Sequence, residues 1–292
     1  MNTIHKPVIA VLGTGLMGQP IARNLHRYGY TVHVWNRTLA KAQDLQKEGL
    51  SIFETAAQAV KNADVILTVL KDGLAVEDTI RSASTRISKG TIWIQLSTVG
   101  LEATSHLKQF ADKHGIIFYD IPMQGTRLPA EQAQLIFLAS GPLEQRQRIE
   151  PILNVIGKKT FWISTEIGAS SRLKLALNSW VFALTNGLAE SLSLAQGLGI
   201  DPQLVVDVVS GSPMDNGYFQ LKSKAILNQD YSANFSIKNA IKDAELIMDA
   251  AQQVHLQLDL VPAGLCRFQR AAQQGHADKD MAASYLAEKL KD

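Results

Sequence analysis

The chain has 292 residues, of which 46% are hydrophobic and 19% charged, so it is long enough for two hydrophobic cores. Its formal net charge is only +2 and its basic residues are scattered, which argues against a nucleic-acid partner. One cysteine, Cys266, excludes an intramolecular disulfide, and the first residues lack the apolar core of a signal peptide. We therefore expect a cytoplasmic protein of two domains.

A strand followed by a glycine-rich turn opens the chain. The apolar run Val8–Leu12 predicts a buried parallel strand, and Gly13-Thr14-Gly15-Leu16-Met17-Gly18 follows it at once as G-x-G-x-x-G. A helix over residues 19–28 and a strand over residues 31–35 come next, which is the context that the dinucleotide fingerprint requires. There the glycines allow a tight turn, close approach of a pyrophosphate and close helix packing. The alternative is an ordinary glycine turn.

The end of the second strand predicts which dinucleotide binds. Asn36-Arg37-Thr38 stands where a site for NAD usually places an acid on the ribose 2′-hydroxyl. An arginine can instead pair with a 2′-phosphate, so we predict NADP(H) in preference to NAD(H), with Thr38 and Lys41 as helpers. The alternative is that Arg37 is simply a solvated residue after a strand.

The alternation of helices and strands continues through the first half of the chain and predicts a parallel sheet. Helices are predicted over residues 39–48, 55–61, 73–86, 102–113 and 143–156, and strands over residues 51–53, 65–70, 91–96, 116–121, 135–139 and 160–163. Ligands of open α/β sheets bind outside the carboxyl ends of the strands. Leu70, Lys71, Ser97 and Thr98 are therefore candidate contacts for the nicotinamide half of the cofactor.

The predicted domain boundary lies near Ser164. A loop is predicted to begin at Pro122, and the last strand ends before the boundary. Everything after Asp201 has a helical pattern without strands. We expect an NADP-binding Rossmann domain over residues 1–164 and an all-α domain over residues 165–292, joined by a long helix.

That helix, Gly168 to Gln196, has apolar residues on nearly every face, which predicts that it is buried. Lys174 and Asn178 are four residues apart, so they stack on one side, and Ser171 and Thr185 fall on the same polar stripe. Burial can lower a lysine pKa by up to roughly 3 to 5 units, toward values useful for proton transfer. The alternative is that Lys174 snorkels to the surface.

The order of these pieces resembles the β-hydroxyacid dehydrogenase family over nearly the whole chain. The family's cofactor motif is matched by Gly13 to Gly18, with Met17, and by the Asn36-Arg37-Thr38 ending of its NADP-using branch. Its D-x-S-T segment is matched by Ser97-Thr98, with Gln95 in place of the aspartate.

Three later motifs of the family also have counterparts. Its substrate loop D-A-P-V-S-G-G corresponds to Asp120 to Thr126, where Gln124 replaces the serine and Thr126 the second glycine. Its G-x-G-x-x-x-K-x-x-x-N motif is similar to Gly168 to Asn178, with Ser170 in place of the second glycine. Its K-D pair matches Lys242-Asp243, whose lysine lies near cofactor and substrate in relatives.

The resemblance implies hydride transfer between the cofactor and the carbonyl carbon of a small aldehyde or keto acid. Lys174 would donate a proton to the developing alkoxide, and Asn178 would orient the lysine or the substrate. The implied catalytic residues are Lys174 and Asn178; the cofactor contacts are Gly13, Gly15, Leu16, Met17, Gly18, Asn36, Arg37, Thr38, Leu70, Lys71, Thr98 and Lys242; the substrate contacts are Ser97, Met123, Gln124, Gly125, Thr126, Lys174 and Asn178.

Two other functions stay open at this point. Imine reductases are similar in fold but place another residue where Lys174 stands, and a non-catalytic NADP-binding module would have no use for a buried lysine. The seven histidines show no paired ligand spacing, so no metal is expected. No membrane span is expected, because the longest apolar run contains a lysine and a glutamate. The apolar helices of the second half of the chain predict a homo-oligomer, most simply a dimer.

Overall fold

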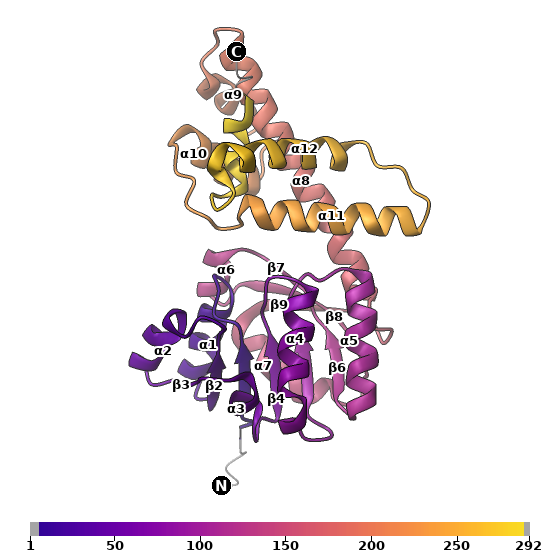
Figure 1. Cartoon of the computed structure of the whole chain (residues 1–292). Coiled ribbons are helices and arrows are strands. Elements are labelled where there is room, and N and C mark those ends of the chain that lie inside the picture. Colours follow the sequence, from indigo (N-terminus) through magenta and orange to yellow (C-terminus); the bar gives the residue numbers. More distant parts are fainter. Residues whose placement is uncertain (1–5, 289–292) are drawn as a thin grey trace. The chain divides into compact units, whose positions relative to one another are not determined.

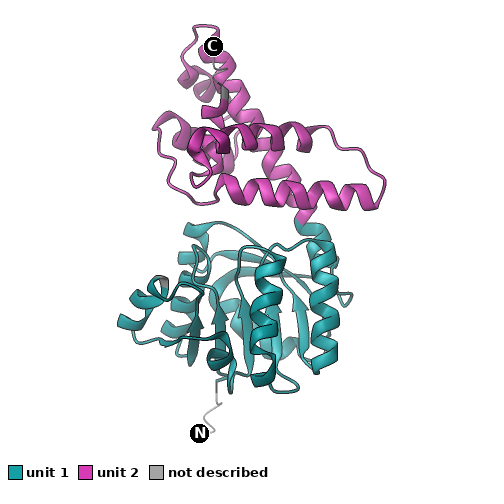
Figure 2. Ribbon diagram, viewed as in Figure 1, with its two compact units in different colours: residues 1–174 teal, residues 175–292 magenta. Residues whose placement is uncertain are grey.

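The computed structural model describes residues 6–288, and the chain divides into two compact units, residues 1–174 and 175–292 (Figure 2). The division falls within the long helix α8, Ala169–Gly197. The last strand, β9 (Gly157–Ser164), ends at the boundary predicted from the sequence. That boundary stays a prediction, because the compact units part within the helix that follows.

The first unit is built on one sheet, with strands in the order β3-β2-β1-β4-β5-β6-β8-β7 and β9 paired to β8. The strands before β9 are β1 (Ile9–Leu12), β2 (Val32–Trp35), β3 (Ser51–Phe53), β4 (Val65–Thr68), β5 (Ile92–Gln95), β6 (Ile117–Asp120), β7 (Met123–Gln124) and β8 (Leu135–Ser140). The strands from β3 to β6 are mutually parallel, in the order of a Rossmann sheet.

Helices cover both faces of this sheet (Figure 1). One core cluster joins the sheet to α1 (Gly18–Arg27), α2 (Gln43–Lys47) and α7 (Arg146–Ile156). The other joins it to α3 (Ala56–Val60), α4 (Gly73–Ala83) and α5 (Leu101–His114). Burial on both faces explains why the central strands are continuous apolar runs in the sequence.

Two features of the first unit differ from the sequence prediction. The parallel sheet is confirmed for most strands, but β8 runs antiparallel to β6. The segment predicted to be a loop after residue 121 contains the short strand β7, paired with β8, and is followed by the helix α6 (Arg127–Glu131). Strands and helices this short carry too few residues to show a periodicity, so only pairing within the fold reveals them.

The regular structure in the described part of the second unit is helical, apart from one isolated β-bridge between Ser236 and Asp280, which confirms the predicted all-α half. Its helices after α8 are α9 (Pro202–Val209), α10 (Gly217–Leu227), α11 (Ile237–Gln253) and α12 (Leu260–Ala271), followed by the short helical turns η3 (Ala272–His276) and η4 (Met281–Glu288). A buried ion pair between Lys222 and Asp280, at 2.5 Å, ties α10 to the last turns of this unit. None of the described helices is both long and apolar enough to span a membrane.

The prediction that α8 is buried on nearly every face was wrong for one side of the helix. Phe182 and Leu192 are buried, but Trp180 is 63% exposed and Leu194 is 64% exposed. Phe182 packs edge-on against Phe268 of α12, with ring centroids 5.5 Å apart. The periodicity could not reveal this one-sided covering, because apolar residues stand on both sides of the helix.

Candidate active site

The glycine turn after β1 has the geometry of a phosphate cradle. Gly13 has a φ of +111°, and a Cβ there would lie 2.2 Å from the carbonyl oxygen of Val69. A Cβ on Gly18 would lie 1.9 Å from the carbonyl oxygen of Gly13. No atom lies within 4 Å of the position where Gly15 would carry a Cβ. Two glycines are therefore required for packing, whereas the third leaves open room beside the turn.

The buried Thr14 hydroxyl in the same turn has no hydrogen-bond partner within the described structure. The Thr14 backbone N–H donates to Asn36 Oδ1 at 3.0 Å, and Asn36 Nδ2 donates to the Thr38 carbonyl at 2.8 Å. Asn36 thus joins the turn to the end of β2. An unpartnered hydroxyl beside open backbone fits a bound dinucleotide phosphate, since it offers an unused donor to an anion.

The other residues predicted to contact the cofactor near β1 and β2 differ in exposure. Arg37 and Thr38 are exposed just beyond β2. The segment Asn36-Arg37-Thr38 contains no acidic residue. Leu16 is exposed on the turn, whereas Met17 packs against the sheet core and so has a structural part. The side chain of Lys41 lies outside the described residues.

The segments after β4 and β5 are joined through Ser97, which the buried amide of Gln95 holds in place. Gln95 Oε1 accepts from the backbone N–H of Ser97, and its Nε2 donates to the Ser97 carbonyl, both at 2.7 Å. Ser97 Oγ in turn accepts from the Leu70 N–H at 2.8 Å. Ser97 is therefore buried and engaged in structure, although it was predicted to contact substrate. Lys71 remains exposed and pairs with Asp72 at 3.0 Å.

The predicted substrate loop is shaped by the pairing of β7 with β8. Met123 faces the sheet core, so the alternation of a strand turns Gln124 to the opposite side. Gly125 has a φ of +123°, and a Cβ there would lie 2.9 Å from a methyl group of Leu135. The chain therefore turns sharply directly after Gln124, before the partly buried Thr126.

The first turn of α8 is held by side chains from the sheet. Asp120, fully buried at the end of β6, accepts from the Ser171 backbone N–H at 3.0 Å and from its hydroxyl at 2.9 Å. Ser140, at the end of β8, accepts from the Ser170 N–H at 3.1 Å. The residue that precedes the helix, Gly168, has no side chain with which to cap it. Two strands therefore supply the acceptors that a helix N-terminus needs.

Burial raises the pKa of the Asp120 carboxyl to about 6, although the hydrogen bonds from Ser171 and from the backbone of Gly168 oppose the rise. Arg172 contributes a further, weaker opposing charge. Desolvation is the largest cause, because it penalises the ionised form. Asp120 is thus a titratable group bonded to Ser171, which lies three residues before Lys174 on α8.

The predicted polar stripe of α8 is buried: Ser171, Lys174, Asn178 and Thr185 all lie below a tenth exposure, and Lys174 is 6% exposed. The alternative of a snorkelling lysine is therefore wrong. Lys174 Nζ donates a hydrogen bond to Gln124 Oε1. A buried ammonium requires such an acceptor, because an unpaired buried charge is strongly unfavourable.

Within the second unit, Asn178 is fixed by an acid. Asn178 Nδ2 donates to Asp243 Oδ2 at 2.8 Å, and Lys242 Nζ lies 2.5 Å from the other oxygen of Asp243. Asp243 is almost completely buried. The carboxylate therefore determines which way the Asn178 amide faces, a role that the sequence motif did not reveal.

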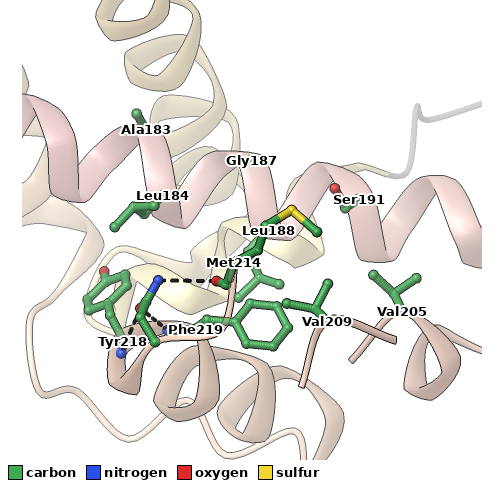
Figure 3. A pocket seen from close by; sticks show the side chains of 11 residues that line it. Ala183, Leu184, Gly187, Leu188, Ser191, Val205, Val209, Met214, Tyr218 and Phe219 are labelled. Atoms are coloured by element: carbon green, nitrogen blue, oxygen red, sulfur yellow. Dashed lines mark hydrogen bonds between the residues drawn. The ribbon is translucent and has the colours of Figure 1, made fainter. Parts of the chain in front are cut away.

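The second unit also contains a cavity of about 250 Å³ between α8, α9 and α10 (Figure 3). Leu184, Gly187 and Leu188 of α8 face it, together with Val209 and Phe219. By helical spacing, Gly187 lies on a different side of α8 from Lys174 and Asn178, whereas Leu188 lies close to their side. No charged side chain lines the cavity, and its polar lining is Ser191, Asn216 and Tyr218.

Comparison with known proteins agrees with this geometry. A family model described as the NAD-binding domain of 6-phosphogluconate dehydrogenase matches residues 8–164. A second, described as NAD-binding of NADP-dependent 3-hydroxyisobutyrate dehydrogenase, matches residues 168–287. The chain belongs to the β-hydroxyacid dehydrogenase family. It is an oxidoreductase that binds NAD(P).

Relatives of known name cover almost all of the chain. Glyoxylate/succinic semialdehyde reductase 1 of Arabidopsis thaliana is 28% identical over 285 residues, 97% of this chain and 98% of that protein. The 3-hydroxyisobutyrate dehydrogenase of Mycobacterium tuberculosis, solved with L-serine, is 26% identical with a TM-score of 0.87, covering 98% of this chain and 100% of that one. An imine reductase from Pseudomonas sp. shares the fold at 24% identity, with a TM-score of 0.67 and coverage of 98% and 100%.

In this β-hydroxyacid dehydrogenase, the raised pKa of Asp120 predicts an unusual dependence of stability on pH. Its folded pKa, about 6, is above the reference value of 3.8, so the fold favours the protonated form. This contribution to stability is present at acid pH and is lost as the pH rises through about 6. We expect the stability of the wild type relative to Asp120→Asn to rise by up to about 3 kcal/mol between pH 7.5 and pH 4.

The measurement is urea unfolding of both proteins at a series of pH values, since the difference between them cancels other titrating groups. Asp44→Asn is the matched control, because it removes an exposed carboxylate of the same unit. A wild-type advantage that stays constant from pH 4 to 7.5 would contradict the assignment.

Proposed function

We propose that the protein is an NADP-dependent reductase or dehydrogenase. It moves a hydride between nicotinamide and the carbonyl or alcohol carbon of a small β-hydroxyacid or semialdehyde, with Lys174 as general acid and base. One observation carries the proposal: Lys174 is a buried lysine on the polar stripe of α8, bonded to an amide from the predicted substrate loop. The names of the relatives support the class of substrate.

NADPH, when bound, supplies the hydride. In the direction of reduction, Lys174 donates a proton from Nζ to the oxygen that becomes negative, and in oxidation it accepts that proton. Its burial strengthens the attraction between the ammonium and the developing negative charge. Asn178, one turn further along α8, is held by Asp243 with its amide in one orientation, ready to bind the substrate oxygen or the lysine.

The cofactor is proposed to bind at the glycine turn, with phosphate beside Gly15 and the ribose phosphate on Arg37. Thr38 assists there, and the nicotinamide half is assigned to Leu70, Lys71, Thr98 and Lys242. The preference for NADP over NAD is supported by the absence of an acidic residue from residues 36–38, where a site for NAD usually places one. Gln124, Gly125 and Thr126 are proposed to line the substrate pocket. Met123, also predicted as a substrate contact, instead anchors this segment in the sheet core, and Ser97 supports it from the segment after β5.

The principal alternative is an imine reductase on the same fold. The resemblance of such enzymes to this chain is one of fold, and the lysine that suits an alkoxide favours carbonyl substrates. A panel of small semialdehydes, keto acids and cyclic imines, followed through NADPH oxidation, separates the two. Turnover of the imines in preference to every carbonyl compound would select the alternative, and binding of NADPH without turnover would select a non-catalytic module.

Removal of the lysine tests its chemical role. We expect Lys174→Ala to lower kcat by at least about a hundredfold, because it removes a positioned acid, while the NADPH affinity stays nearly unchanged. Steady-state kinetics and fluorescence titration with NADPH give the two quantities. The control is Arg172→Ala, an exposed position on the same turn of α8. Wild-type kcat in Lys174→Ala would remove this residue from the mechanism.

A charge reversal tests the choice of cofactor. Arg37→Asp opposes a 2′-phosphate and offers a carboxylate to a ribose hydroxyl, so the ratio of kcat/KM for NADPH over NADH should fall by at least about tenfold. Arg27→Asp, with the same charge change on an exposed residue at the end of α1, controls for general electrostatics. Equal use of both cofactors by the wild type would contradict the preference.

We also propose a homo-oligomer, most simply a dimer, with the helical unit in its interface. Exposed apolar side chains support it: Trp180, Leu194, Leu198, Val208, Met214 and Leu260. A contiguous apolar patch larger than a few hundred Å² usually marks an interface, and a twofold dimer is the commonest closed arrangement. Light scattering during size exclusion should give a mass of at least twice 31.9 kDa, and a mass near the monomer at micromolar concentration would contradict the proposal. A cytoplasmic location without nucleic-acid or membrane partners stays a prediction from composition.

A further inference from the structure

The buried amide of Gln95 is bonded on both of its arms to one residue. Its Oε1 accepts from the Ser97 backbone N–H and its Nε2 donates to the Ser97 carbonyl, both at 2.7 Å. A backbone N–H only donates and a carbonyl only accepts, so these bonds fix which arm of the amide faces which group. Both bonds together require a donor and an acceptor. An ionised acid here, such as the aspartate of the family pattern, lacks the donor.

Side chains of β4 and β5 complete a polar network around Gln95. Trp93 Nε1 donates to Thr68 Oγ1 at 3.0 Å, and Thr68 Oγ1 donates to Gln95 Oε1 at 3.4 Å. Thr68, Trp93 and Gln95 have no exposed surface, and Ser97 is buried beside them. Removal of one member therefore leaves another buried polar group without its partner, which is unfavourable.

The network reaches the glycine turn through Ser97 and Leu70. Ser97 Oγ accepts from the Leu70 backbone N–H at 2.8 Å, which joins the segment after β5 to the segment after β4. Leu70 lies beside the turn, because a Cβ on Gly13 would be 3.0 Å from one of its methyl groups. The strands β1, β4 and β5 are neighbours in the sheet, and ligands of such sheets bind outside their carboxyl ends. The placement of both segments thus depends on one amide.

We propose that Gln95 is a positioning residue for the nicotinamide half of the cofactor. It holds the backbone of Ser97 and, through the Ser97 hydroxyl, that of Leu70, so that residues 70–71 and 97–98 form a preset wall for the nicotinamide. Gln95 has no exposed surface, so it acts through this backbone and not by direct contact. The inference rests on the proposed function, which assigns the nicotinamide half to these two segments.

Two ligands that differ only in the nicotinamide test this role. NADP⁺ contains the ring, whereas 2′-phospho-ADP-ribose lacks it but has the same phosphates. The ratio of their dissociation constants, from calorimetric titration, measures what the nicotinamide adds to binding and cancels the titration of the phosphates. We expect the wild type to bind NADP⁺ at least about tenfold more tightly, by a similar ratio at pH 6 and pH 9, because the network has no ionisable side chain. NAD⁺ and ADP-ribose form an equivalent pair, so the test does not depend on which dinucleotide is preferred.

Gln95→Met removes both arms of the amide and keeps a side chain of similar length. We expect it to lower the ratio at least about fivefold at both pH values, because the Ser97 N–H and carbonyl lose their partners. Binding of 2′-phospho-ADP-ribose should change by less than about twofold, which also shows that the variant is folded. The matched control is Gln132→Met, at an exposed glutamine that ends α6, and it should leave the ratio unchanged.

Gln95→Glu keeps the shape of the side chain and makes its donor depend on pH. A protonated carboxyl both donates and accepts, whereas the ionised form cannot donate to the Ser97 carbonyl. Burial raises the pKa of a carboxyl at this place, and so does the charge of Asp120, which lies opposite Gln95 in the register of β5 and β6. We expect a ratio within about threefold of the wild type at pH 6 and at least about fivefold below it at pH 9. A residue that only fills space would not show this dependence.

Ser97→Ala tests the next link with a smaller change. It removes the acceptor for the Leu70 N–H and keeps both bonds from Gln95, which involve the backbone of residue 97. We expect the ratio to fall at least about threefold at both pH values. This variant decides the question if Gln95→Met binds neither ligand.

Turnover of small semialdehydes and keto acids keeps this inference separate from the proposed reaction. If the ratios follow this pattern but the wild type reduces none of these compounds, the proposed reaction is wrong and the positioning role of Gln95 stands. If the wild type reduces one of them and the Gln95 and Ser97 variants keep the wild-type ratio, the reaction stands and this inference is overturned. Equal affinity of the wild type for both ligands would overturn it as well.

Discussion

The buried carboxylate of Asp120 is the interaction on which the candidate site depends. It binds both the backbone N–H and the hydroxyl of Ser171, so the end of β6 fixes the start of α8. Helix geometry then sets the position of Lys174 one turn later. Burial disfavours the ionised form of this carboxyl group and raises its pKa to about 6. A strand end therefore orients a functional helix by a hydrogen bond that is partly dependent on pH.

Other polar side chains of the buried stripe follow the same rule of pairing. Lys174 has the amide of Gln124, and Asn178 has the carboxylate of Asp243. Burial of charged and polar groups is tolerated only with such partners, which also restrict their orientation. The restriction matters for chemistry, because a proton donor acts efficiently only when it is already in place. Burial and function thus impose the same requirement on this stripe.

Amides stand at two positions where the family pattern has other residues, and both have a structural explanation. Gln95 stands in place of an aspartate, and its oxygen and nitrogen hold both backbone groups of Ser97. Gln124 stands in place of a serine and extends as far as Lys174. A residue-by-residue comparison shows these departures as mismatches. The contacts show that Gln95 uses both a donor and an acceptor, which an ionised aspartate does not combine, and that Gln124 supplies the acceptor for Lys174.

The sequence by itself determined the Rossmann sheet, the helical second half, and the burial of Lys174, because strand runs, the glycine turn and helical spacing are local patterns. It also indicated the NADP-type ending of β2. Only the tertiary structure decided that Asp120 caps α8, that Ser97 is engaged by Gln95, that β8 reverses direction, and that one side of α8 stays exposed. Asp120 and Ser171 are far apart in the chain, and local periodicity carries no information about which distant side chains meet.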